Sequence, residues 1–116
     1  MPRDVRAYLW DIRYASDAIF RFLGDMDSKT YGRAELVSSA VERKFEIIGE
    51  ALGQLAKLDP ELAERIPDFK PIVAFRNLLI HGYAVVDSER VLRIARTSLP
   101  ELRAAVDALL TELGTP

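Results

Sequence analysis

The sequence predicts an all-α fold, an antiparallel bundle of four long helices and one short helix. Apolar residues recur every three or four positions along nearly the whole chain, which is the spacing of one face of an α-helix. No segment alternates apolar and polar residues in the manner of a half-buried strand. A chain of 116 residues is expected to form one domain, here residues 1–116, and amphipathic helices of this length pack best as a bundle.

The first helix is predicted between Asp4, a suitable N-cap, and Gly24, a suitable stop. A polar turn follows over residues 25–29, and a second long apolar pattern runs over residues 33–58. Gly49 and Gly53 lie in this second helix, four residues apart. Because neither carries a side chain, we expect another helix to approach closely there.

Asp59 and Pro60 mark the start of a short helix, because Asp is a good N-cap and proline fits the first helical position. Pro67 ends this short helix. A further helix is predicted from Pro71 onward, and it weakens at Gly82.

The last helix is predicted to begin with Asp87 or Ser88 as its cap and to run to about residue 110. Pro100 lies inside it. A proline within a helix removes one internal hydrogen bond and clashes with the preceding turn, so we expect a kink at Pro100.

The composition narrows the classes of function. The chain has no cysteine and one histidine, so a thiolate metal site is excluded, and we expect neither a structural metal nor a cofactor. Its formal net charge of −2 argues against a broadly basic surface but is compatible with a local basic cleft. No signal peptide and no apolar run of the ~20 residues that span a membrane are visible, so a cytoplasmic, soluble protein is expected.

Residues 75–83 combine apolar positions with an arginine, an asparagine, the single histidine and a tyrosine. On a straight helix, Arg76 and Tyr83 are about 20° apart and share a face, whereas His81 is about 140° from Arg76. Asn77 is about 40° from His81, close enough for its side chain to form a hydrogen bond with the imidazole.

Two geometries would bring Arg76 and His81 into one site. The helix unwinds around Gly82, which has the necessary backbone freedom, or two copies of the segment meet across a dimer. In the dimer, which we favour, Arg76 and His81 of opposing chains line a composite groove.

These residue types suit RNA cleavage without a metal. A neutral imidazole can accept the proton of a 2′-hydroxyl, and an imidazolium can protonate the leaving 5′-oxygen. A symmetric dimer would supply one His81 for each role. Arg76 can bind the phosphate through two parallel hydrogen bonds, and Tyr83 can donate a hydrogen bond or stack on a base.

The spacing of Arg76, four residues, and then His81-Gly82-Tyr83 resembles the motif of the HEPN superfamily (higher eukaryote and prokaryote nucleotide-binding). The wider sequence is similar to the HepT toxin branch over nearly the whole chain. The segments that carry this similarity are Val41-Glu42-Arg43, residues 45–51 and residues 99–102.

The resemblance implies a dimeric helical ribonuclease that acts as the toxin of a toxin–antitoxin pair. It further implies a partner, a minimal nucleotidyltransferase (MNT) antitoxin, which can transfer AMP to the motif tyrosine, here Tyr83. An AMP group would add bulk and negative charge where RNA phosphates must lie, a physical route to silencing.

Plainer interpretations stand beside this one. The groove could bind nucleotide or RNA without cleaving it, or the chain could be a structural helical bundle in which the motif is incidental. A buried arginine needs a partner, and Glu46 and Glu50 are candidates to pair with Arg76 and orient it. The arginines at 90, 93 and 96 recur every three residues and either flank an RNA groove or form a solvated face.

Overall fold

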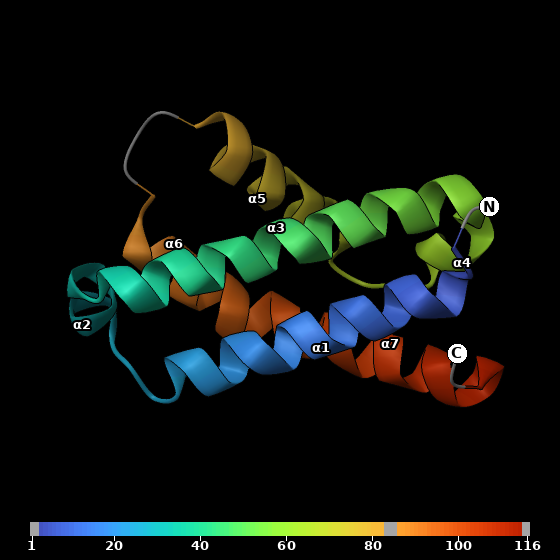
Figure 1. Ribbon diagram of the computed structural model, residues 1–116, viewed down its shortest axis with the longest axis horizontal. Helices are drawn as coiled ribbons and strands as arrows, with labels where there is room; N and C mark the ends of the chain where they lie inside the picture. The colour runs from blue at the N-terminus through green and yellow to red at the C-terminus, as the bar shows by residue number, and fades with distance from the viewer. Residues whose placement is uncertain (1–2, 83–85, 115–116) are drawn as a thin grey trace.

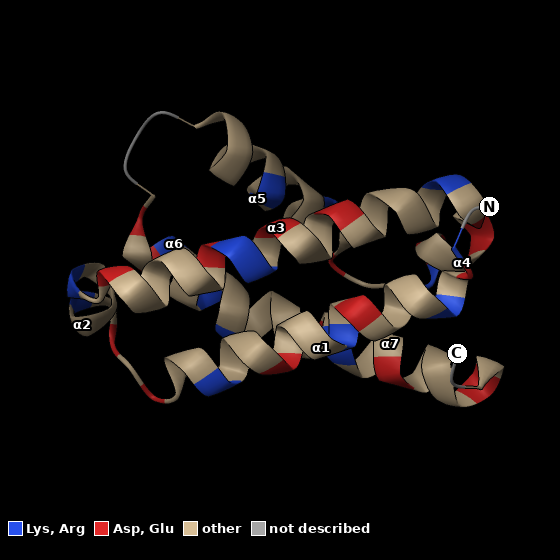
Figure 2. Cartoon of the chain, viewed as in Figure 1, with Lys and Arg blue, Asp and Glu red and all other residues tan. Residues whose placement is uncertain are grey.

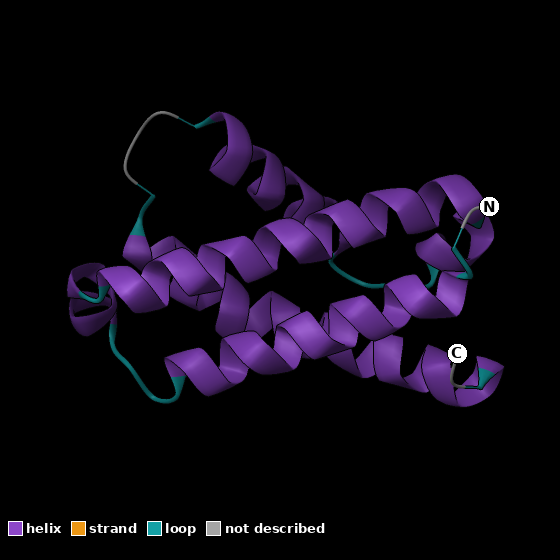
Figure 3. Ribbon diagram, in the orientation of Figure 1, coloured by secondary structure: helices purple, strands orange, loops and turns teal. Residues whose placement is uncertain are grey.

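The computed structural model describes residues 3–82 and 86–114, and every regular element within them is a helix (Figures 1 and 3). The predicted all-α bundle is confirmed. The elements are α1 (Val5–Leu23), α2 (Ser28–Arg33), α3 (Glu35–Leu58), α4 (Pro60–Glu64), α5 (Phe69–His81), α6 (Ser88–Arg93), the π-helical segment η1 (Ile94–Ser98) and α7 (Leu99–Leu113).

The long helix α3 organises the bundle. It packs antiparallel to α1 on one side and to α5 on the other, and α1 in turn packs against α7 (Figure 1). The path from α6 through η1 to α7 serves as the fourth long helix. No helix in the described ranges is both long and apolar enough to cross a membrane.

Aspartate side chains cap four of the helices. Asp4, Asp27, Asp59 and Asp87 each accept a hydrogen bond from a backbone N–H in the first turn of α1, α2, α4 and α6. The caps at Asp4, Asp59 and Asp87 are those predicted from the sequence. Hydrogen bonds from the side chain and backbone of Arg6 lower the pKa of Asp4 to about 2.

Helix α2 was missed from the sequence, which predicted a polar turn over residues 25–29 and no helix between that turn and residue 33. Five of its six residues are polar or glycine, so its apolar pattern is too short to be recognised. The helix forms because Asp27 caps it and because Tyr31, which is 2% exposed, is buried in the core. Tertiary packing therefore decides whether α2 forms.

The core is a single apolar cluster to which each long helix contributes. At its centre Phe45 of α3 and Phe75 of α5 meet edge to face, with ring centroids 5.1 Å apart. This geometry is one that aromatic pairs prefer. Other fully buried side chains around this pair are Leu9, Ile12, Ile19, Ile48, Leu52, Leu55, Ile72, Leu99, Leu102 and Val106.

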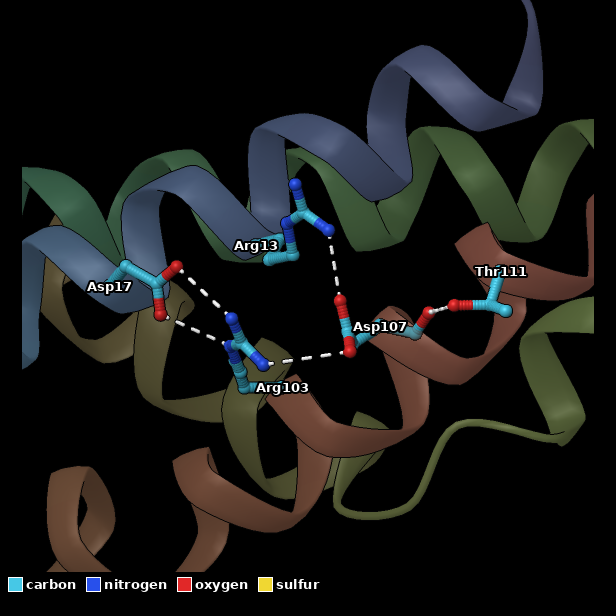
Figure 4. Close-up of polar contacts among 5 residues, drawn as sticks. All are labelled: Arg13, Asp17, Arg103, Asp107 and Thr111. Carbon is cyan, nitrogen blue, oxygen red and sulfur yellow. Dashed lines mark hydrogen bonds and ion pairs between the residues drawn. The ribbon is translucent and has the colours of Figure 1, made fainter. Parts of the chain in front are cut away.

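An ion-pair network joins the outer surfaces of α1 and α7 (Figure 4). Arg13 Nη1 lies 2.9 Å from Asp107 Oδ1, and Arg103 Nε lies 3.1 Å from Asp17 Oδ1. Arg103 also lies 3.8 Å from Asp107. Each of these side chains is about a third exposed, so solvent screens the pairs and they orient the two helices more than they stabilise them.

The helical path is interrupted near Pro100, as predicted, but the interruption takes an unexpected form. In η1 the hydrogen bonds span five residues, and the N–H of Leu99 donates to the carbonyl of Ile94. Pro100 then occupies the first turn of α7, where a backbone N–H is not needed. Pro100 has no backbone N–H to donate, and the wider π-helical turn of η1 just upstream accommodates this missing hydrogen bond.

Two carboxyl groups, those of Asp68 and Glu101, interact at the turn that leads into α5. Asp68, just before α5, has a φ of 60°, a left-handed conformation that Asp tolerates better than most residues. A hydrogen bond with Asp68 and the repulsion between the two groups raise the pKa of Glu101 at the start of α7. Only a protonated carboxyl can donate in such a pair, so the contact is favourable when the pair holds one proton.

Glu101→Gln is expected to raise the unfolding temperature at pH 7, because the amide can donate to Asp68 without a proton from solvent. The raised pKa of Glu101 means that the favourable contact is present at acidic pH and is lost as the pH rises through the folded-state pKa. The gain over the wild type should therefore shrink as the pH falls below about 4.3, the ordinary pKa of Glu.

The measurement is thermal unfolding by circular dichroism between pH 3.5 and pH 8. Asp25→Asn, at an exposed position between α1 and α2, controls for the loss of one negative charge. An equal rise of the unfolding temperature in both variants, or a rise that does not depend on pH, would contradict a proton shared between Asp68 and Glu101.

Candidate active site

Arg76 is held against α3 at the one point where that helix carries no side chain. A Cβ added to Gly49 would overlap Cβ and Cγ of Arg76, so the aliphatic part of the arginine occupies this space. Gly53 has no such neighbour within 4 Å. The predicted close approach is therefore confirmed at Gly49 and wrong at Gly53.

The guanidinium of Arg76 is half-buried and pairs locally. Its Nη1 donates to Oδ1 of Asn77 over 3.1 Å, whereas its buried Nε finds no acceptor among the described residues. Within the same ranges no ion pair joins Arg76 to Glu46 or Glu50. The carboxylate partners considered from the sequence are thus replaced by an amide, which leaves the positive charge of Arg76 unneutralised.

A hollow of about 210 Å³ opens beside Arg76 between α3 and α5. Glu50 and Lys57 both line it, so it presents charges of either sign next to the arginine. Glu50 therefore lies near Arg76 without a direct ion pair. The full lining is Gly49, Glu50, Gly53, Gln54, Lys57, Val73 and Arg76.

Three glutamates, Glu42, Glu46 and Glu50, lie four residues apart along α3, and basic residues lie between the first two (Figure 2). Burial and the nearby Glu46 raise the pKa of Glu42. Burial and the charge of Glu42 likewise raise the pKa of Tyr31. This row makes the N-terminal half of α3 locally acidic, whereas Lys57 of the same helix lines the hollow beside Arg76.

His81 is the last residue of α5 and is exposed. The chain leaves the helix at Gly82, which has extended backbone angles (φ −79°, ψ 130°) and whose N–H donates to the carbonyl of Leu78. The expected hydrogen bond between Asn77 and His81 is absent from the described residues, and Oδ1 of Asn77 accepts from Arg76.

Because α5 remains helical through His81, the unwinding considered from the sequence begins one residue too late to redirect the imidazole. Five residues on a helix correspond to about 140° of rotation and about 7.5 Å along the axis. Arg76 and His81 of one chain therefore point to different sides of α5. The dimeric alternative stays a prediction.

The structure does not test two further predictions, which concern Tyr83 and a bound metal. Tyr83 lies outside the described residues. Within those residues no group of three or more His, Asp and Glu side chains is arranged to hold a metal ion.

The chain matches the family model described as "Ribonuclease HepT-like" over residues 12–109. The matched span contains α3, α5 and the whole candidate site. The chain belongs to the HepT-like ribonuclease family. The HEPN-type resemblance read from Arg76 and His81 is thereby confirmed at the level of the family.

Relatives of this HepT-like chain cover nearly its full length. Two proteins of Methanocaldococcus jannaschii, whose names assign them provisionally as RNases, are 35% and 32% identical over 114 residues. These alignments span 97% of this chain in both cases and 97% and 93% of the relatives. A protein of Thermococcus cleftensis, named provisionally as a HepT ribonuclease, is 28% identical and covers 94% of this chain and 98% of its own length. No solved structure matches the chain.

The sequence left the role of Arg90 open, and the structure places this residue beside the site. Its guanidinium carbon lies 5.8 Å from the ring centroid of Phe75, the residue that precedes Arg76. The only feature of the sequence that pointed to Arg90 was the three-residue spacing of the arginines at 90, 93 and 96. Because that spacing is equally typical of a solvated face, it could not identify the contact with α5.

Gly49→Ala is expected to destabilise the HepT-like fold by about 1–3 kcal/mol, because the added methyl group overlaps the stem of Arg76 and forces α3 and α5 apart. Gly53→Ala is the matched control. It adds the same group to the same helix in open space and should stabilise by about 0.5–1 kcal/mol, the usual gain from replacing a mid-helix glycine.

Both free energies of unfolding come from denaturant titration followed by circular dichroism. If Gly49→Ala were as stable as Gly53→Ala, the close packing of Arg76 against α3 would be wrong.

Proposed function

We propose that this chain is an endoribonuclease that cleaves RNA without a metal, in a groove shared by two copies, and that it acts as the toxin of a toxin–antitoxin pair. The observation that carries the proposal is the exposed His81 at the end of α5, five residues after a held arginine, in a chain of the HepT-like ribonuclease family. An exposed imidazole at a helix end can reach a substrate and exchange protons with it.

In the proposed cleavage, a 2′-hydroxyl of the RNA itself is the nucleophile, and its attack on phosphorus is coupled to proton transfer. His81 of one copy accepts the proton of a 2′-hydroxyl, and the 2′-oxygen attacks the adjacent phosphorus. The bond from phosphorus to the 5′-oxygen breaks, and that oxygen takes a proton from the imidazolium of the second copy's His81. Arg76 stabilises the charge that develops on the phosphate.

A second copy is part of the proposal because Arg76 and His81 diverge within one chain. The side of α5 that carries His81 also carries an exposed apolar side chain, Leu78, about 60° around the helix from the histidine. Leu78 is 39% exposed. Burying it against the same face of another copy would remove apolar surface from water and bring two histidines together.

The proposed partner in the cell is a nucleotidyltransferase antitoxin of the minimal type. It would transfer AMP from ATP to the hydroxyl of Tyr83 with release of pyrophosphate. Tyr83 is two residues beyond His81, so the added phosphate would lie close to the imidazole and repel the RNA backbone.

His81→Ala and Arg76→Ala are expected to lower the rate of RNA cleavage at least about a hundredfold, the lower bound for a group in general acid–base catalysis or electrostatic stabilisation. The assay uses purified protein, mixed cellular RNA and EDTA, after an intact-mass measurement has shown that Tyr83 carries no AMP. Arg21→Ala, an exposed arginine on α1, is the control and should keep wild-type activity.

If folded wild-type protein binds RNA and does not cut it, the nuclease proposal fails, and a nucleotide- or RNA-binding module becomes the better description. Equal cleavage by His81→Ala and the wild type would remove His81 from the mechanism.

Tyr83→Phe is expected to prevent silencing by AMP transfer, because the acceptor hydroxyl is gone. Wild type and variant are each co-expressed with the nucleotidyltransferase, and their masses and effects on growth are compared. We expect an added AMP on the wild type only, and growth inhibition by the variant. Silencing of both proteins without added mass would show that the antitoxin acts by covering the site.

A further inference from the structure

The arginines at 90, 93 and 96 form one stripe on the α6–η1 segment, yet the structure gives each a different environment. Arg96 is committed to the fold, because its Nη2 donates to the carbonyl oxygens of Gly24 over 3.3 Å and of Met26 over 2.6 Å. These bonds hold the connection between α1 and α2 against the helical segment. One of the two terminal nitrogens of Arg96 is therefore used within the fold.

Arg93 lies in an acidic setting. It lines a shallow hollow between α2 and α6 together with Asp27 and Glu89. Two carboxylates in the same hollow offset the charge of Arg93 and make the hollow a poor site for a phosphate.

Arg90 differs from both. Its guanidinium lies over the ring of Phe75, it is exposed to solvent, and no carboxylate of the described residues lies within ion-pairing distance. Phe75 itself is fully buried and braced by Phe45, so the ring that Arg90 covers is fixed. A guanidinium on a fixed ring loses less freedom when it binds a ligand than one on a mobile side chain.

Arg90 contacts α5 at the residue next to Arg76. Phe75 and Arg76 are consecutive residues of α5, so their Cα atoms are about 3.8 Å apart, and their side chains point about 100° apart around the helix. Two arginines from different helices are thus held at consecutive residues of α5. An RNA strand carries one phosphate charge per nucleotide, so a strand with one phosphate at Arg76 has others within reach on either side.

We propose that Arg90 binds an RNA phosphate that flanks the scissile one, and so positions the strand on α5 for cleavage. The inference rests on the proposed ribonuclease function and extends the binding surface from α5 to α6. Arg90 acts here as a positioning residue that contacts the substrate backbone, with no part in proton transfer.

The test separates binding from cleavage by using protein with His81→Ala in every sample, so that the RNA stays intact. Binding of a labelled single-stranded RNA is measured by fluorescence anisotropy at several salt concentrations. Adding Arg90→Gln is expected to weaken binding about tenfold and to reduce the slope of log affinity against log salt by about 0.7, the value for one lost phosphate contact. Arg93→Gln, the matched control on the same stripe, should change neither quantity.

Arg90→Lys keeps the charge but not the paired hydrogen bonds of a guanidinium, so it should retain the salt slope and lose part of the affinity. In the otherwise wild-type protein, Arg90→Gln should raise KM for RNA cleavage about tenfold and leave kcat nearly unchanged, as expected of a group that binds substrate and transition state equally.

Equal effects of Arg90→Gln and Arg93→Gln, or an unchanged salt slope in folded Arg90→Gln protein, would overturn the role of Arg90 while leaving the nuclease proposal intact. The nuclease proposal itself fails on a different result, the absence of cleavage by the wild type. Thermal unfolding of each variant verifies that it is folded.

Discussion

The rest of the structure depends on the close contact between α3 and α5 at Gly49. Without a side chain there, α3 admits the stem of Arg76 directly against its backbone, and the neighbouring Phe75 can meet Phe45 edge to face in the core. Interiors of proteins are packed too tightly to absorb an extra methyl group at such a point. The position of α5, and with it the orientation of Arg76, follows from one missing Cβ.

This contact divides the candidate site into a rigid part and an exposed part. Arg76 is held by α3 and by Asn77, whereas His81 stands at the exposed end of α5. Because α5 is helical through His81, the two side chains leave the helix about 140° apart. This divergence is the reason why a second copy is part of the proposed function.

The distribution of charge shows how an acidic protein can offer a local site for an anion. Several arginines are paired within the fold, among them Arg13 and Arg103 of the α1–α7 network and Arg96, which donates to backbone carbonyls. Arg76 and Arg90 instead form no ion pair among the described residues and lie on or beside α5, although Glu50 lines the same hollow as Arg76.

The sequence by itself determined the all-α class, the capping aspartates of α1, α4 and α6, the end of α5 at Gly82 and the family, because these depend on local periodicity, cap chemistry and a short motif. Only the tertiary structure decided that α2 forms, that Gly49 and not Gly53 receives a helix, that Arg76 pairs with Asn77, and that Arg90 lies over Phe75. Apart from the pair of neighbours Arg76 and Asn77, each of these depends on which side chains meet between elements distant in the sequence, and helical spacing alone contains no information about that partner.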